Sequence, residues 1–243
     1  MVTIAFPVTT VYDVMDYVAA RYNVPADVPS GELPPDLPGP LRDLHLRFGL
    51  LGTQAIRVQR RRGGDLDWQE GIFVNQDFLV PASYFPKSTF VAKNGDFKGQ
   101  RLLTFVYENQ GCWYLHVPLN ADDDPPVLMS EDLKAMKGCQ QVADKLSEFL
   151  AVFVLRETIM GSPFLWTRGG ELNLSCFKLS LKPLLIGASY VYPELRHDFY
   201  IDETGAVLFM HEPNCDNIWI ASLSSNLHSI VNDRSDVQQV NPR

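Results

Sequence analysis

The residues best suited to chemistry gather in one short stretch, HEPNCD, at positions 211–216. A histidine, a glutamate, a cysteine and an aspartate so close together could ligate a metal ion. A metalloprotease helix of the H-E-x-x-H type would need histidine where this chain has Cys215, and Pro213 would obstruct the helix that aligns the two ligands. We therefore interpret the stretch as the exit of a hairpin, and we predict no metal site and no cofactor.

Two further patterns suggest catalysis but lack the geometry for it. The residues GASYV at 187–191 resemble a nucleophile elbow, G-x-S-x-G, without the closing glycine that permits the sharp turn. His197 and Asp198 could form an acid–base pair, yet neighbours on a strand point to opposite faces and would not orient each other. A phosphate-binding glycine loop is also missing from the sequence. We expect a protein that binds a partner and is not an enzyme.

Charge and composition narrow the class of partner. The 243 residues include 21 Lys and Arg against 29 Asp and Glu, a net charge of -8, which opposes binding to nucleic acid or to an anionic membrane. A basic protein partner suits this charge, although acidity can also serve solubility alone. Four widely spaced cysteines indicate free thiols in a reducing cytoplasm. With neither a secretory signal pattern nor an apolar run long enough to span a bilayer, we expect a cytoplasmic protein.

The N-terminal part predicts two helices joined by a proline-rich segment. Thr10 and Asp13 match a capping box at the start of the first helix. Six prolines between positions 25 and 40 indicate an extended linker or an ordered loop without regular structure. A second, short helix should run over 40–49, because proline suits its first turn and glycine its end. The first helix and most of the prolines form a lead-in over residues 1–36.

The middle of the chain predicts strands. We expect a strand at 56–58 with an exposed arginine turn after it at 60–62. Two runs rich in β-forming residues, 102–107 and 112–118, flank a polar connection that contains a glycine, which indicates a hairpin. The three aspartates at 122–124 and the two prolines after them cannot continue a ladder, so the chain should leave the sheet there.

The C-terminal half predicts a long helix over 141–160, which becomes almost wholly apolar and should pack on the sheet. Residues 164–193 give no assignable pattern. Beyond them we expect a hairpin over 199–210, a strand over 218–221, a short helix over 223–231 and a mobile tail over 232–243. Because strands come in hairpins and helices lie mainly before and after them, the sequence predicts a single α+β domain over 1–243. It would have a central, mainly antiparallel sheet flanked by helices.

The strongest candidate for a binding surface follows the first hairpin turn. Trp113 and Tyr114 lie on the returning strand, and Asp122, Asp123 and Asp124 follow it, so together they could form an acidic, aromatic surface for a basic protein. The simpler alternative is a solvated loop in which one aspartate caps a turn. Calcium binding is disfavoured, because an EF-hand spaces its acidic ligands at alternate positions.

The same stretch resembles the central signature of the SUKH superfamily, which includes fungal cell-wall synthesis regulators and many bacterial immunity proteins. The resemblance rests on ENQGCWYLHVPLNADDDPPVLM at 108–129, on an early helix that ends in a glycine at 37–49, and on a helix at 146–157. It implies an α+β domain that acts by binding. Its signature adds Glu108 to the expected partner contacts Trp113, Tyr114 and the three aspartates.

Bacterial members of this superfamily are commonly immunity proteins, which bind and neutralise a cognate toxin, often a nuclease or deaminase, inside the producing cell. The resemblance implies this function, and an acidic chain suits the occlusion of a basic active site. The alternative is an adaptor or regulator that binds an endogenous partner in cell-wall or signalling control. An enzyme is the third possibility.

Overall fold

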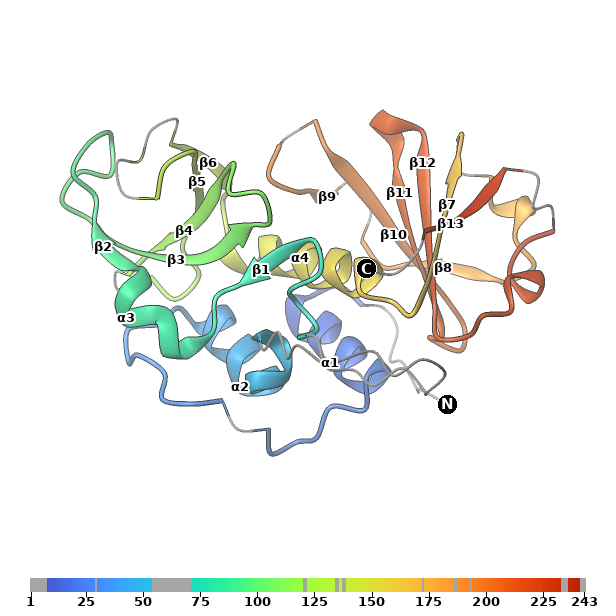
Figure 1. Ribbon diagram of the computed structural model, residues 1–243, viewed down its shortest axis with the longest axis horizontal. Helices are drawn as coiled ribbons and strands as arrows, with labels where there is room; N and C mark the ends of the chain where they lie inside the picture. The colour runs from blue at the N-terminus through green and yellow to red at the C-terminus, as the bar shows by residue number, and fades with distance from the viewer. Residues whose placement is uncertain are drawn as a thin grey trace. The chain divides into compact units, whose positions relative to one another are not determined.

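The computed structural model describes residues 8–28, 30–53, 71–119, 122–133, 136, 139–171, 173–185, 188–192, 194–232 and 236–240. Within these ranges the chain forms four α-helices and two antiparallel sheets of six and seven strands (Figure 1). The predicted α+β class and the hairpin-built, antiparallel strands are confirmed. The strands divide between two sheets, where one central sheet was expected. The strand expected at 56–58 and the arginine turn at 60–62 lie outside the described residues.

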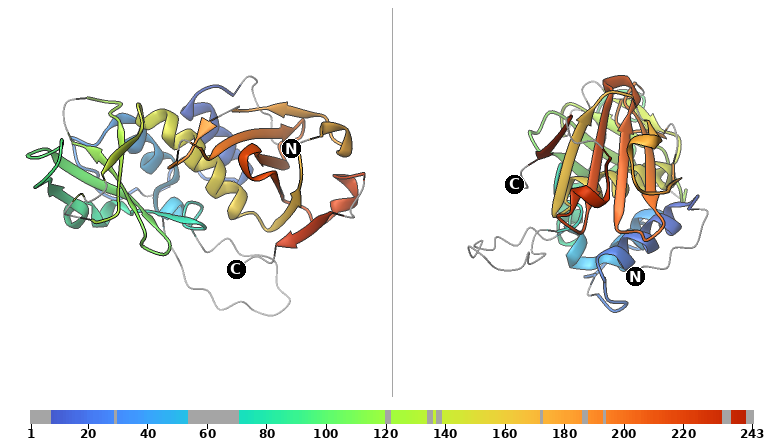
Figure 2. Two further views of the ribbon diagram at one scale, coloured as in Figure 1. Left: turned by 90° about the horizontal axis from the view of Figure 1, so that it is seen from above. Right: turned by 90° about the vertical axis from the view of Figure 1, so that its right-hand side faces the viewer.

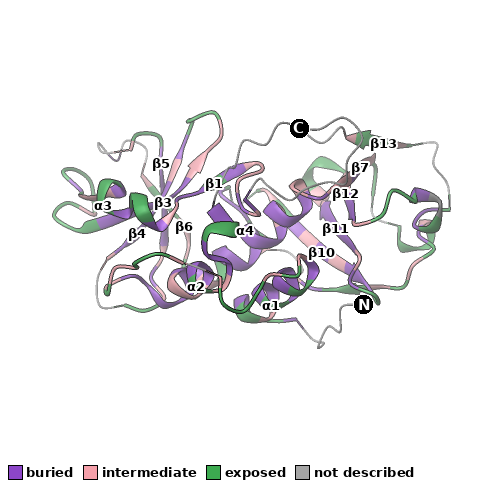
Figure 3. Ribbon diagram, turned by 60° about the horizontal axis from the view of Figure 1, so that its bottom comes forward, coloured by how far each residue is buried: buried purple, intermediate pink, exposed green. Residues whose placement is uncertain are grey.

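The chain divides into two compact units, which we describe separately. Unit 1 combines Met1–Asn23 with Val152–Arg243, and unit 2 is Val24–Ala151. Helix α4 (Leu146–Met160) contributes its first residues to unit 2 and the rest to unit 1. Most of this helix is buried (Figure 3), as its nearly continuous apolar sequence requires. That the whole chain forms one SUKH-like domain stays a prediction.

Unit 2 holds the six-stranded sheet. Its strand order is β1-β3-β4-β5-β6, with β2 also paired to β3. The strands are β1 (Asp77–Leu79), β2 (Thr89–Val91), β3 (Arg101–Glu108), β4 (Tyr114–Pro118), β5 (Val127–Ser130) and β6 (Gln140–Ala143). The helical elements are α2 (Gly39–Thr53), the 3-10 turn η1 (Ala82–Tyr84) and α3 (Phe85–Ser88). The predicted hairpin is therefore β3–β4, and the polar stretch after β4 leaves the sheet as expected.

The proline-rich segment of unit 2 is an ordered loop, the second of the two alternatives that its composition allowed. Leu37 is only 1% exposed and anchors the loop in the core. Arg42, on the following helix, donates to the Pro35 carbonyl at 3.1 Å. Arg101 forms an ion pair with Asp36. These bonds fix the chain immediately before α2 begins.

Unit 1 holds the seven-stranded sheet, whose strands lie side by side in Figure 2. Their order is β13-β7-β12-β11-β10-β8, with β9 also paired to β10. The strands are β7 (Phe164–Gly169), β8 (Leu181–Pro183), β9 (Ala188–Ser189), β10 (Arg196–Asp202), β11 (Val207–Glu212), β12 (Asn217–Ser222) and β13 (Val237–Val240). Short 3-10 turns are η2 (Leu174–Cys176), η3 (Pro213–Cys215) and η4 (Leu227–Ser229). An apolar cluster that includes Trp166, Phe209 and Ile220 forms a core of this unit.

Helix α1 (Val11–Arg21) opens unit 1 with the predicted capping box between Thr10 and Asp13. At its other end Arg21 is 2% exposed, and its Nη1 atom donates to the carbonyls of Gly205 at 3.0 Å and Ala206 at 2.9 Å. Its Nη2 atom donates to the Ser162 hydroxyl at 3.3 Å. Backbone carbonyls thus replace the water that a buried guanidinium loses. Arg21 ties α1 to the β10–β11 turn and to the segment after α4.

Two predictions, the start of the long helix and the mobile tail, are wrong, and two others hold in part. The helix predicted over 141–160 begins at Leu146, because residues 140–143 pair with β5 as strand β6. The regular helix of α2 ends at Gly49 as predicted, because its φ of 49° is not helical, and a second helical segment of the same element continues to Thr53. The expected mobile tail contains β13, which pairs with β7. The short helix predicted over 223–231 amounts to the single 3-10 turn η4.

Candidate functional site

Glu108 shapes the turn between β3 and β4. Its Oε2 atom accepts hydrogen bonds from the backbone amides of Gln110 and Cys112, each at 2.9 Å. The Glu108 carbonyl accepts from the amide of Gly111 at 3.0 Å, and Gly111 has a φ of 72°. The glycine supplies the left-handed residue that such a turn needs. One carboxylate oxygen of this predicted contact residue is therefore already used by the fold.

Trp113, the second predicted contact residue, is 9% exposed. Its backbone carbonyl accepts from the Glu108 amide at 3.2 Å, which closes the hairpin. An indole that the fold already buries to this extent has little surface left for a partner to cover. Its burial explains a tryptophan at this position by packing alone, and its role as a partner contact stays a prediction.

Tyr114 belongs to a row of aromatic residues across three strands. The register pairs Phe78 on β1 with Tyr107 on β3, and Tyr107 with Tyr114 on β4. Residues directly opposite one another in antiparallel strands point to the same face. The rings of Tyr107 and Tyr114 pack edge to face, with centroids 5.6 Å apart and an interplanar angle of 89°. We call Phe78, Tyr107 and Tyr114 the aromatic row.

The aromatic row is partly exposed, although Ser130 and His116 on the same face of the unit 2 sheet are buried. Phe78 is 42% exposed, and both tyrosines are partly exposed. The adjacent residues of the same strands are buried and form the opposite face: Leu79, Val106 and Leu115. Sequence reasoning found Tyr114 but missed Phe78 and Tyr107. Only the strand register, which depends on pairing over long sequence distances, brings the three together.

The three aspartates form hydrogen bonds within the fold. The Asp123 carbonyl and its Oδ1 atom both accept from the amide of Gly39, the first residue of α2, at 3.0 Å. Asp124 accepts from the backbone amide of Ser147 at 2.7 Å and from its hydroxyl at 2.6 Å, in the first turn of α4. Asp122 accepts from the amide of Asp124 at 3.1 Å.

Two of these carboxylates therefore cap helices from outside the helices themselves. The first amides of a helix lack partners within it, and negative charge is favoured at that end. Pro125 adds to this arrangement, because its carbonyl accepts from the Leu146 amide at 2.8 Å. The solvated-loop alternative predicted that one aspartate caps a turn. In the structure, two of the aspartates cap helices whose first residues are distant in sequence. Whether any of the three aspartates also contacts a partner stays a prediction.

A buried polar triad crosses the same sheet. His116 lies between Thr104, whose Oγ1 atom is 3.0 Å from Nδ1, and Ser130, whose Oγ atom is 2.8 Å from Nε2. Ser130 donates its own proton to the Asp132 carbonyl at 2.7 Å. The Nε2–H group must then donate to Ser130, so this histidine cannot accept the serine proton. Burial lowers the pKa of His116 to about 4, and the triad is built for a neutral imidazole.

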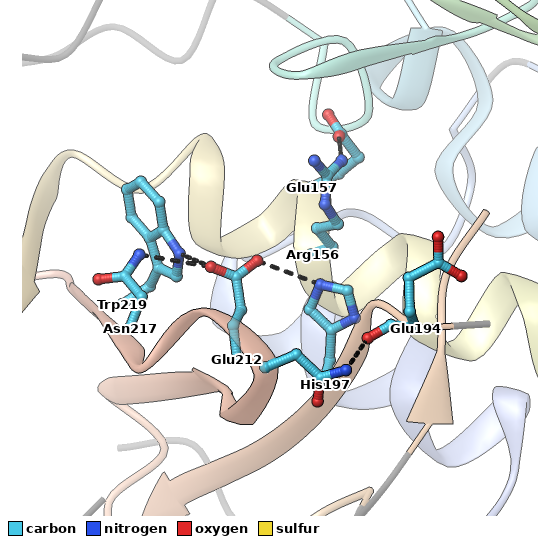
Figure 4. A network of polar contacts seen from close by, with 8 residues as sticks. Arg156, Glu157, Glu194, His197, Glu212, Asn217 and Trp219 are labelled. Atoms are coloured by element: carbon cyan, nitrogen blue, oxygen red, sulfur yellow. Dashed lines mark hydrogen bonds and ion pairs between the residues drawn. The ribbon is translucent and has the colours of Figure 1, made fainter. Parts of the chain in front are cut away.

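Two histidines of unit 1, His197 and His211, each pair with a carboxylate on the neighbouring strand. His197 Nε2 is 3.3 Å from Glu212 Oε1 (Figure 4). His211 Nδ1 is 3.7 Å from Asp198 Oδ2. His197 and Asp198 are consecutive strand residues and point to opposite faces, so they do not pair with each other, as the sequence predicted. Each histidine instead pairs across the β10–β11 hairpin.

Glu212 is the most constrained carboxylate in this network. Its Oε2 atom accepts from the Trp219 indole at 2.7 Å and from the Asn217 amide at 3.3 Å. Burial alone would raise the pKa of the Glu212 carboxyl, but the bonds from His197 and Trp219 lower it below its usual value. The His197 ring is 2% exposed and stacks on Phe199. These contacts join the two strands of the hairpin.

The stretch at 211–216 connects β11 to β12, in agreement with its interpretation as a hairpin exit. Cys215 lies exposed in η3, while His211 is 9% exposed and pairs with Asp198. Across the described ranges, no group of three or more His, Cys, Asp or Glu side chains could hold a metal ion. In the elbow-like stretch at 187–191, Ser189 lies on the short strand β9.

Among the helices that the structure describes, none is long and apolar enough to cross a membrane. Comparison with known proteins finds no matching family model, no matching curated protein and no matching solved structure.

Proposed function

We propose that this protein binds another protein without chemistry of its own, and that it neutralises a cognate toxin in the producing cell. The observation that carries the proposal is the partly exposed aromatic row of the unit 2 sheet. Partly exposed aromatic residues on a rigid support are typical anchors of protein interfaces. The resemblance of residues 108–129 to the SUKH superfamily supports the immunity role.

The charge of the chain supports a basic partner. A net charge of -8 favours encounter with a basic protein and opposes encounter with nucleic acid. Toxins that act on nucleic acids carry basic surfaces for the same electrostatic reason. An acidic protein that covers such a surface would block access of the nucleic acid to the toxin.

Binding is tested by calorimetry between this protein and the product of the gene next to its own, together with growth rescue when both are expressed. We expect tight binding and rescue, and we expect Phe78→Ala to weaken both because it removes an anchor from the aromatic row. Leu174→Ala is the matched control, since Leu174 is 46% exposed and lies in unit 1. Thermal melting of both variants excludes a loss of folding as the cause.

Failure of binding and rescue would refute the immunity role. An endogenous partner recovered from the native cell, whose binding is weakened by Phe78→Ala and not by Leu174→Ala, would instead establish the adaptor or regulator. If neither change affects the binding of any recovered partner, the aromatic row is not the interface.

A further inference from the structure

We propose that the tip of the β3–β4 hairpin binds an arginine side chain of the partner protein. This inference rests on the proposed function, because it names the chemistry by which the partner is recognised. The tip consists of Glu108, the turn at 109–112 and Tyr114, next to the aromatic row. It differs from the acidic stretch at 122–124, where Asp123 and Asp124 cap helices.

The carboxylate of Glu108 is held in place with one oxygen to spare. Oε2 accepts from two backbone amides of the turn, while Oε1 has no hydrogen-bond partner among the described residues. Two bonds to the backbone fix the carboxylate direction before any ligand arrives, which lowers the entropy cost of binding. A fixed anionic oxygen on a partly exposed residue suits a cationic donor.

Tyr114 borders the same turn. A methyl group placed on Gly111 would lie 3.6 Å from the Tyr114 hydroxyl oxygen, so this phenol reaches the turn that Glu108 closes. Within the described ranges the Tyr114 hydroxyl has no hydrogen-bond partner. The Tyr107 hydroxyl, in contrast, lies 3.2 Å from Ser88 Oγ. Tyr114 therefore keeps both a ring and a free hydroxyl available at the tip.

These groups fit a guanidinium better than an ammonium ion. A guanidinium is planar, stacks on aromatic faces and presents several donors in a fixed fork. One donor could reach Glu108 Oε1 and another the Tyr114 hydroxyl while the plane covers a ring of the row. A lysine would meet the charge but could not use the ring and both acceptors together.

The test uses the full-length protein and the peptide acetyl-Gly-Arg-Gly-amide as the probe, with its citrulline counterpart as the neutral control. Binding is followed by NMR at the amides of Gln110, Gly111 and Cys112, which report on the turn. We expect saturable shifts with the arginine peptide and weak, non-saturating shifts with citrulline. A lysine peptide should bind less tightly than the arginine peptide.

Glu108→Gln is the decisive variant. Its amide oxygen can still accept the two turn bonds, so the turn resonances of the free protein should stay close to those of the parent protein. Loss of the charge should weaken the arginine peptide roughly tenfold. Glu171→Gln, at an exposed glutamate of unit 1, is the control and should leave binding unchanged. Tyr114→Phe should weaken binding by a smaller factor than Tyr114→Ala.

Equal shifts with citrulline, the absence of saturable shifts, or unchanged affinity in Glu108→Gln would each overturn the inference. Its failure is separable from failure of the proposed function. Binding of the neighbouring gene product with no arginine-peptide site would leave the toxin-binding role in place and reject only the tip. A working arginine site without binding of that product would support the arginine site at the tip and reject the toxin-binding role.

Discussion

Removal of the Asp124 carboxylate should destabilise the protein substantially, although the residue lies in an acidic loop at the surface. Asp124→Ala removes two short hydrogen bonds to Ser147 and the negative charge at the start of α4. Loss of a helix cap costs about 1 kcal/mol, and a hydrogen bond to a charged group contributes about 1.5–3 kcal/mol. We expect a loss of roughly 2–3 kcal/mol in the free energy of unfolding.

The measurement is urea unfolding followed by tryptophan fluorescence, with two comparison variants. Asp124→Asn keeps an acceptor for the Ser147 amide but loses the charge and the second acceptor, so it should cost about 1 kcal/mol, less than Asp124→Ala. Asp96→Ala removes an exposed aspartate of the same unit and should change stability by less than about 0.5 kcal/mol. A result in which Asp124→Ala is no more destabilising than Asp96→Ala would refute the capping role.

The second cap allows a stricter test, because Gly39 and Asp123 share one interaction. A Cβ atom on Gly39 would lie 2.5 Å from Asp123 Oδ2, so Gly39→Ala must displace the carboxylate. Gly39→Ala and Asp123→Ala should each cost about 1–2 kcal/mol. With the carboxylate already removed, alanine should be neutral or slightly stabilising in the helix. Additive costs in the double variant would contradict a shared cap.

Three further predictions concern buried ionisable side chains. Burial lowers the pKa of both His45 and His116 to about 4, below the ordinary value of 6.5, so the unfolded chain binds more protons between these limits. Stability should be complete above pH 6.5 and fall towards pH 4 by up to about 3 kcal/mol per histidine, and His116→Asn should flatten this dependence in urea unfolding. Arg21→Ala should cost roughly 3 kcal/mol by the same measurement, because it removes bonds to two carbonyls and two hydroxyls. A loss no greater than that for an exposed arginine would contradict this anchor. Glu212→Gln should shift the Trp219 emission, since it alters the acceptor of the indole, and an unchanged spectrum would argue against that bond.

The local elements were predictable from the sequence because their causes are local. The capping box at Thr10 needs only a threonine and an acidic residue three positions later, and α1 has it. The β3–β4 turn needs only a glycine in a polar connection, which Gly111 supplies with its left-handed backbone. In both cases, side chains within a few residues of one another determine the local backbone conformation.

The roles of the candidate site residues could not be predicted in this way. Asp123 lies 84 residues from Gly39, and Asp124 lies 23 residues from Ser147, so nothing in the local sequence indicates that either carboxylate caps a helix. The predicted start of α4 was wrong for a related reason. Residues before Leu146 have helical spacing in the sequence, but they pair with β5 as strand β6. Pairing with β7 likewise makes a strand of a polar tail.

The contacts of the residues at 108–129 suggest a structural interpretation of the sequence resemblance. Gly111 and Asp124 are among the residues that carry it, and Gly111 makes a turn while Asp124 caps α4. A stretch whose residues are occupied in this way specifies a geometry, and it leaves the choice of partner to side chains that point outwards. Phe78 lies outside the stretch, and Tyr107 directly precedes it. In the proposed function, the hairpin and its capped helices would provide the framework, and the aromatic row would decide which partner is bound.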